Sequence, residues 1–129
     1  MLRPLDYRVW LKSKAIMLDV TGFRGDRIYA VGYPEGIHHS DCILMQFTGG
    51  IDISGSKVYQ HDVIRTDYDT LAIVMWSPKS CAYEAVSKDG EYAQIMTGIE
   101  FELATIIGDV HSSPIFFNLF QEIILDGNL

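Results

Sequence analysis

The chain has 129 residues, a length that suits one compact domain able to bury a core without a metal or disulfide. Hydrophobic residues make up 48% and charged residues 21%, which excludes disorder, and no apolar run approaches the roughly 20 residues of a membrane-spanning helix. The net charge of −7 argues against nucleic-acid binding, which depends on Lys and Arg neutralising phosphates. The opening MLRPLDYRVW lacks the features of a signal peptide, and two cysteines are too few for a disulfide framework. We therefore expect a cytoplasmic protein with reduced thiols.

Short apolar runs alternate with turn signals at close spacing, which predicts an all-β domain. The predicted strands are, in chain order, Leu5–Leu11, Ala15–Val20, Arg27–Gly32, Asp41–Thr48, Lys57–Tyr59, Asp62–Arg65, Leu71–Trp76, Ala82–Val86, Tyr92–Met96 and Phe101–Ile107. The nearly continuous apolar run of Asp41–Thr48 predicts a strand buried on both faces. The segment YPEGIHHSD before it is predicted to be a loop, and Asp89-Gly90 predicts a hairpin turn.

The C-terminal tail has a different, helical pattern. Ser112 and Ser113 offer an N-cap, Pro114 suits the first helical position, and Asp126-Gly127 ends the pattern. The apolar positions follow at helical spacing, namely Ile115, Phe116, Phe117, Leu119, Phe120, Ile123 and Ile124. This stripe is wider than a helix lying on one sheet needs. Either it closes the core of its own domain, or part of it packs on a neighbouring subunit.

The charge is unevenly distributed along the chain. Residues 1–30 carry six basic and three acidic side chains, and residues 31–129 carry four basic and fourteen acidic ones. Either these charges are ordinary solvated groups, or the basic residues 1–30 of one copy contact the acidic residues 31–129 of another.

The glycine-rich stretch from Gly49 to Ser56 does not fit a phosphate loop. Gly50 and Gly55 have the spacing of a Walker motif, but Ser56-Lys57 inverts the required Lys-Ser order. No helix is predicted after it that would hold an anion at its N-terminus. We therefore expect a turn between two strands.

The histidines, cysteines and acids suggest no complete metal or catalytic site. HHSDC places His38 and Cys42 at the spacing of half a zinc site, but no second half is evident, so exposed loop histidines are expected. A hydrolase that uses His61 with Asp62, or His111, stays an alternative. Residues that are adjacent in sequence need not form a catalytic arrangement in space.

Three segments in order resemble a known family. MQFTGGIDISGSKVYQHDVI, Met45–Ile64, is similar to the hallmark of the YopX-like proteins of phages and prophages of Gram-positive bacteria, YRVW resembles their opening, and GDVHSSPIFF resembles their closing segment. Two positions depart from the family pattern. Gly50 replaces a usual leucine, so that a core anchor is lost or replaced by Ile51 or Ile53, and His61 replaces a glycine.

The resemblance implies a mostly β fold, a small SH3-like β-barrel with additional N-terminal strands and a short C-terminal helix. It spans nearly the whole chain, as one domain over residues 1–129, with N-terminal strands and loop in 1–40 and the barrel core and helix in 41–129. The family carries no known activity or functional residues that could be transferred.

We therefore predict a non-enzymatic phage or prophage accessory protein of the host cytoplasm, without cofactor or metal. It acts through self-assembly as a homo-oligomer or through contact with a phage or host protein. Self-association would use Phe116, Phe117, Phe120 and Ile124. The alternative is a nucleic-acid-binding module whose contacts are Arg3, Arg8, Arg24 and Arg27.

Overall fold

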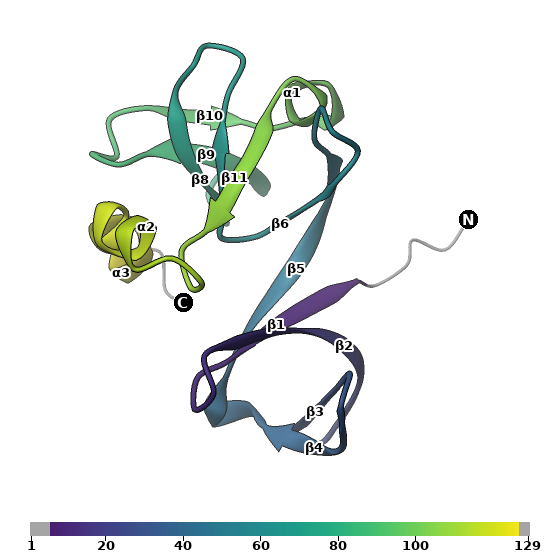
Figure 1. Cartoon of the computed structure of the whole chain (residues 1–129). Coiled ribbons are helices and arrows are strands. Elements are labelled where there is room, and N and C mark those ends of the chain that lie inside the picture. The colour runs from purple at the N-terminus through teal and green to yellow at the C-terminus, as the bar shows by residue number, and fades with distance from the viewer. Residues whose placement is uncertain (1–5, 127–129) are drawn as a thin grey trace. The chain divides into compact units, whose positions relative to one another are not determined.

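The computed structural model describes residues 6–126, and the chain divides into two compact units, Met1–Phe47 and Thr48–Leu129. Both units are built mainly from antiparallel strands, so the prediction of a mostly β protein is confirmed (Figure 1). The elements are β1 (Tyr7–Leu11), β2 (Ile16–Arg24), β3 (Arg27–Ala30), β4 (Tyr33–His38), a 3₁₀ turn (His39–Asp41), β5 (Cys42–Ile51), β6 (Lys57–Tyr59), β7 (Asp62–Arg65), β8 (Leu71–Ser77), β9 (Ala82–Ser87), β10 (Ala93–Ile95), α1 (Gly98–Glu102), β11 (Thr105–Asp109), α2 (Pro114–Leu119) and α3 (Gln121–Asp126). Among residues 6–126, no helix has the length and hydropathy needed to cross a membrane.

The first unit is an antiparallel meander in the order β4-β3-β2-β1, with the first half of β5 paired to β1. Alternate residues of these strands point to one face and form its core. Val9 lies opposite Leu18 of β2 and Leu44 of β5, and it is fully buried. The other buried members of this core are Leu11, Ala30 and Ile37.

The loop predicted over residues 33–41 is wrong, because its first six residues form β4. Ile37 pairs with Ile28 and is buried in the core of the first unit. This burial holds a segment that contains Pro34 and Gly36 in an extended form. Proline is tolerated there because β4 is an edge strand, and Gly36 supplies a backbone φ of +82°.

The second unit contains a five-stranded sheet in the order β10-β9-β8-β7-β11. Both of its faces are buried under separate apolar clusters. Ile64 and Val74 point to one face with Phe101 of α1, while Val63 and Ile73 point to the other with Phe120. This two-sided burial explains why LAIVMW in β8 is continuously apolar.

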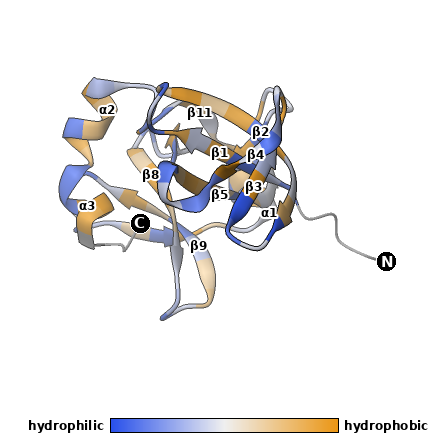
Figure 2. Cartoon of the chain, turned by 90° about the horizontal axis from the view of Figure 1, so that it is seen from below, coloured by the Kyte–Doolittle hydropathy of each residue, from blue (hydrophilic) through white to orange (hydrophobic). Residues whose placement is uncertain are grey.

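The C-terminal segment forms two short helices, α2 and α3, instead of the single predicted helix. Pro114 is the first residue of α2, and the Ser113 hydroxyl accepts a hydrogen bond from the Phe116 backbone N–H, as predicted. The ribbon of both helices alternates between polar and apolar residues (Figure 2). Their apolar side closes one face of the second sheet, because Phe120 and Ile124 are buried in that core.

The strand predicted over Phe101–Ile107 is wrong at its start, where α1 lies. Thr97 and Glu100 form a capping box, in which the Glu100 carboxylate accepts hydrogen bonds from the Thr97 hydroxyl and backbone N–H. Phe101 turns inward from this helix into the core. The strand β11 begins only at Thr105 and carries a bulge between Ile106 and Gly108.

The strand β5 alternates between buried and exposed residues, so the prediction that it is buried on both faces is wrong. Met45 is fully buried, whereas Leu44 beside it is 39% exposed. The β5 strand continues through Ile51, so the turn predicted over Gly49–Ser56 is wrong at its start and occupies residues 52–56 before β6. The prediction of an SH3-like barrel is not confirmed, because the described strands form open sheets with edges at β4, β6, β10 and β11.

Gly50 makes room for Phe101. A Cβ atom on Gly50 would lie 2.2 Å from the Phe101 ring, so the aromatic side chain occupies the space that a larger residue on β5 would need. The expectation that Ile51 or Ile53 replaces the missing leucine is wrong, because both side chains are exposed. The compensating residue is Phe101 of α1.

The buried carboxylate of Asp52 joins the β5–β6 turn to β11. Its Oδ1 accepts hydrogen bonds from the backbone N–H groups of Ser54 and Ser56 and from the Ser54 hydroxyl, at 2.7–3.0 Å. Its Oδ2 accepts one from the Ile106 backbone N–H at 3.0 Å. Burial by itself raises the pKa of Asp52, but the hydrogen bond from Ile106 and those from Ser54 and Ser56 outweigh it, so the pKa lies below its ordinary value.

We predict that Asp52→Asn lowers the free energy of unfolding by about 2 kcal/mol, because an amide NH₂ would face the Ile106 N–H in place of an acceptor. A carboxyl group with a depressed folded-state pKa contributes stability above its unfolded pKa of about 3.9, and this contribution is lost as the pH falls through the folded value. Urea unfolding at pH 7 and pH 3 should therefore show a smaller loss for the variant than for the parent. Exposed Asp67→Asn is the control, and an equal effect of both variants at pH 7 would contradict the assignment.

We predict that Gly50→Leu and Phe101→Ala are each destabilising, by roughly 1–3 and 3–5 kcal/mol, and that the double variant loses less than their sum. The leucine would fill the cavity that the shortened side chain leaves. Urea unfolding of the three variants measures the coupling, which should exceed about 1 kcal/mol. Gly98→Leu is the control, since a Cβ atom there meets nothing within 4 Å. Strict additivity of the two changes would show that the side chains do not share one space.

Candidate functional site

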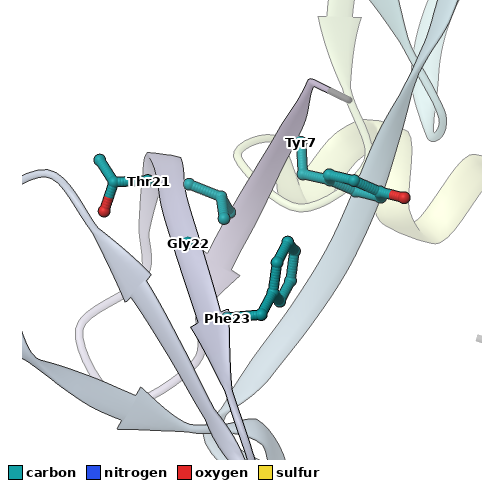
Figure 3. A pocket seen from close by; sticks show the side chains of 5 residues that line it. Tyr7, Thr21, Gly22 and Phe23 are labelled. Atoms are coloured by element: carbon teal, nitrogen blue, oxygen red, sulfur yellow. The ribbon is translucent and has the colours of Figure 1, made fainter. Parts of the chain in front are cut away.

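The first unit has a hollow on β1 and β2. It is lined by Tyr7, Val20, Thr21, Gly22 and Phe23 and has a volume of about 210 Å³ (Figure 3). The rings of Tyr7 and Phe23 meet edge to face, with centroids 5.3 Å apart and planes at 86°. Phe23 nevertheless remains 52% exposed. Phe23 is therefore an aromatic side chain that packs against another ring and still faces solvent over half of its surface.

A bulge in β2 positions Phe23. The register between β2 and β3 shifts between Val20 and Gly22, so one extra residue is inserted there. A bulge reverses the side to which the following residues point. Phe23 consequently faces Tyr7, although strict alternation from Val20 would direct it to the opposite face. The strand predicted from the sequence ends at Val20 and therefore does not include Phe23.

The size and lining of the hollow limit what it can hold. Its volume lies below the roughly 300–1,000 Å³ of typical small-molecule sites. Among the residues of the lining that the structure describes, only Tyr7 and Thr21 have polar side-chain groups, their hydroxyls, and none is charged. Such a hollow suits one apolar side chain of a protein partner, inserted as an anchor.

The three described arginines that were assigned to nucleic-acid contact do not form a continuous basic surface. Arg24 and Arg27 are exposed and directly opposite each other on β2 and β3. Arg8 is half-buried on β1, and Arg3 lies outside the described residues. Residues 6–47 carry five basic and five acidic side chains, so this unit is electrically balanced.

The four residues assigned to self-association differ in exposure. Phe120 and Ile124 are buried inside the second unit and are therefore unavailable for a contact surface. Phe116 is half-buried with its ring against Gly108, and Phe117 is 37% exposed. The tail mainly closes its own core, which was one of the two alternatives.

The second unit brings together two histidines that are 50 residues apart in sequence. The His61 Nδ1 and His111 Nε2 atoms lie 3.0 Å apart, and the ring planes meet at 62°. His61 is buried and has a left-handed backbone φ of 73°, the conformation that glycine adopts most easily. Its backbone N–H donates to the Val74 carbonyl, and its carbonyl accepts from the Val110 N–H.

Two carboxylates flank this histidine pair. Asp62 and Asp109 are opposite each other on β7 and β11. Asp62 accepts a hydrogen bond from the Tyr59 N–H at 2.8 Å, and Asp109 accepts from the N–H groups of His111 and Ser112. These carboxylates therefore hold the backbone of the two turns, which is a structural role. No signal in the sequence could have paired residues so far apart.

The HHSDC segment does not converge on a metal site. The His38 Nε2 atom lies 3.2 Å from the Asp26 carboxylate, and the Cys42 thiol points to the His38 carbonyl. Within residues 6–126, no three His, Cys, Asp or Glu side chains are grouped so that they could hold a metal ion.

The fold of this chain is similar to that of a solved structure. Protein EF1440 from Enterococcus faecalis has a similar fold, with a TM-score of 0.60 and 15% identity, over 89% of this chain and 99% of that one. Protein yopX from Bacillus subtilis matches with a TM-score of 0.49 and 20% identity, over 84% of this chain and 94% of that one. No curated protein matches the sequence. The sequence model of the family described as YopX protein matches residues 6–117, and the chain therefore belongs to the YopX protein family.

Proposed function

We propose that this chain is a non-enzymatic accessory protein of a phage or prophage, which acts in the host cytoplasm by assembling with further copies of itself. The observation that supports this proposal best is the half-exposed Phe23 beside its uncharged hollow. Burying a side chain of this size in a contact contributes roughly 1.5–3 kcal/mol. Aromatic anchors of this kind carry most of the affinity in many protein interfaces.

The charge distribution favours a second copy as the partner. The second unit carries four basic and twelve acidic side chains, whereas residues 6–47 are balanced. Two second units would repel each other. The acidic second unit of one copy can therefore approach the first unit of another copy with less electrostatic repulsion than it meets at a second unit. The same balance weakens the nucleic-acid alternative, because little net positive charge is available for phosphates.

We predict that the protein self-associates and that Phe23→Ala raises the dissociation constant about 30-fold, the effect of losing a central anchor worth about 2 kcal/mol. Sedimentation equilibrium over a range of protein concentrations measures both quantities. Val31→Ala, at another exposed apolar residue of the first unit, is the matched control and should leave association unchanged. A parent protein that stays monomeric at about 500 μM, well above a micromolar dissociation constant, would refute the proposed function.

We also predict no saturable binding of duplex DNA or single-stranded RNA. Fluorescence anisotropy at about 50 mM salt tests this under conditions where phosphate contacts are strongest. Binding that weakens steeply with salt and is lost in an Arg24→Gln, Arg27→Gln variant would instead support the nucleic-acid module.

A further inference from the structure

Two turns of the second unit meet at the His61–His111 pair. His61 lies in the turn between β6 and β7, and His111 lies in the turn between β11 and α2. His61 is buried, and its Nδ1 atom is 3.0 Å from the Nε2 atom of His111. The Val110 backbone N–H joins the same two turns, because it donates to the His61 carbonyl. Of these two attachments, the imidazole pair is the one whose charge can change.

The hydrogen bond between the rings limits how many protons the pair can bind. An N–H···N bond needs one nitrogen as the donor and the other nitrogen, with a free lone pair, as the acceptor. The donor ring can become an imidazolium without losing this bond. A second proton can bind only at the acceptor nitrogen, and two N–H groups of two cations would then face each other across 3.0 Å. The folded pair therefore holds at most one extra proton.

The other titratable groups beside the pair change their charge in other pH ranges. Asp62 begins β7 and Asp109 ends β11, while β6 contributes Lys57 and Tyr59. The strand β8 and the helix α2 carry no titratable side chain. Carboxyl groups ordinarily titrate at about pH 4, and lysine and tyrosine at about pH 10, so histidine is the residue type that gains charge between pH 7 and pH 5. The carboxylates favour the first proton on the pair, but they do not replace the lone pair that the second proton removes.

The turn that contains His111 leads directly into the C-terminal helices. The helix α2 begins at Pro114, and α3 follows it (Figure 1). The backbone N–H groups of Phe120 and Ile124 donate to carbonyls within this helical segment. Their side chains pack on the sheet in the core that β7 and β8 share with the two helices. The segment is thus held on the sheet by apolar packing and by the turn before it, and its release would uncover one apolar face.

We propose that the His61–His111 pair is an acid-sensitive switch, in which protonation of both rings separates the two turns and releases α2 and α3 from the sheet. The closed state holds at most one extra proton on the pair, whereas the open state holds two. Because the open state binds more protons, opening becomes more favourable as the pH falls through the ordinary histidine pKa of about 6.5. Excluding one proton from the closed state raises the opening constant about 25-fold between pH 7 and pH 5. This inference does not depend on the proposed self-assembly.

Hydrogen exchange of the full chain at pH 7 and pH 5, followed by mass spectrometry of its peptides, tests the switch. After correction for the pH dependence of the intrinsic exchange rate, the backbone amides of α2 and α3 should exchange about 25-fold faster at pH 5. The amides of β7 and β8 should keep their protection. The fluorescence of the dye ANS should rise over the same pH range, because ANS binds exposed apolar surface.

His111→Gln is the variant that removes the switch. Glutamine can donate or accept a hydrogen bond but gains no charge in acid, so the exchange of α2 and α3 should no longer respond to pH. His39→Gln, at an exposed histidine outside the pair, is the matched control and should behave like the parent. Circular dichroism at pH 7 checks the fold. If His111→Gln does not fold, His61→Asn takes its place, because asparagine tolerates the left-handed backbone of this position.

Three outcomes overturn the inference. Equal protection of α2 and α3 at pH 7 and pH 5 would show that the pair stays closed in acid. Simultaneous loss of protection in β7 and β8 would show that the pair stabilises the whole unit and does not control the helices. Acid opening that persists in His111→Gln would assign the effect to other titratable groups.

Discussion

The carboxylate of Asp52 is the interaction on which the arrangement of the second unit depends. One buried side chain binds the backbone of its own turn through Ser54 and Ser56, and it binds β11 through the Ile106 N–H, 54 residues away in sequence. A tight turn leaves backbone N–H groups without strand partners, and burying them unsatisfied would be costly. A carboxylate accepts several hydrogen bonds at once and can therefore satisfy these groups together. The position of β11 then determines where α1 before it and α2 after it can lie.

The neighbouring Gly50 shows how a local departure from the family pattern is balanced across the structure. A small residue on β5 would leave a void in a close-packed interior. Phe101 fills this space from α1, which the capping box of Thr97 and Glu100 holds in place. The cost of losing a side chain on a strand is thus offset by an aromatic ring on a helix. Ile99 and Leu103, on either side of Phe101 in the sequence, stay exposed to solvent.

The candidate site could be predicted only in part. The composition indicated the exposed arginines on β2 and β3. It did not indicate that Phe23 lies beside Tyr7, because the bulge at Val20–Gly22 reverses the direction of its side chain and no residue pattern predicts that bulge. The helix α1 was predictable in principle, since Thr97-x-x-Glu100 is a capping-box signal, and the β-rich run after it obscured that signal. The pairing of His61 with His111 was not predictable, because it joins two turns that only the β7–β11 register brings together.

The sequence by itself determined the strand-rich class, the family, the strand β8 and the N-cap of α2. These features depend on local periodicity, turn residues and short motifs, all of which are formed by residues close together in the sequence. Only the tertiary structure decided that residues 33–38 form a strand, that the tail closes its own core in two helices, and that Gly50 lies under Phe101. Each of these outcomes depends on burial against residues distant in sequence, and such burial overrides local preference because packing energies exceed the small propensity differences of single residues.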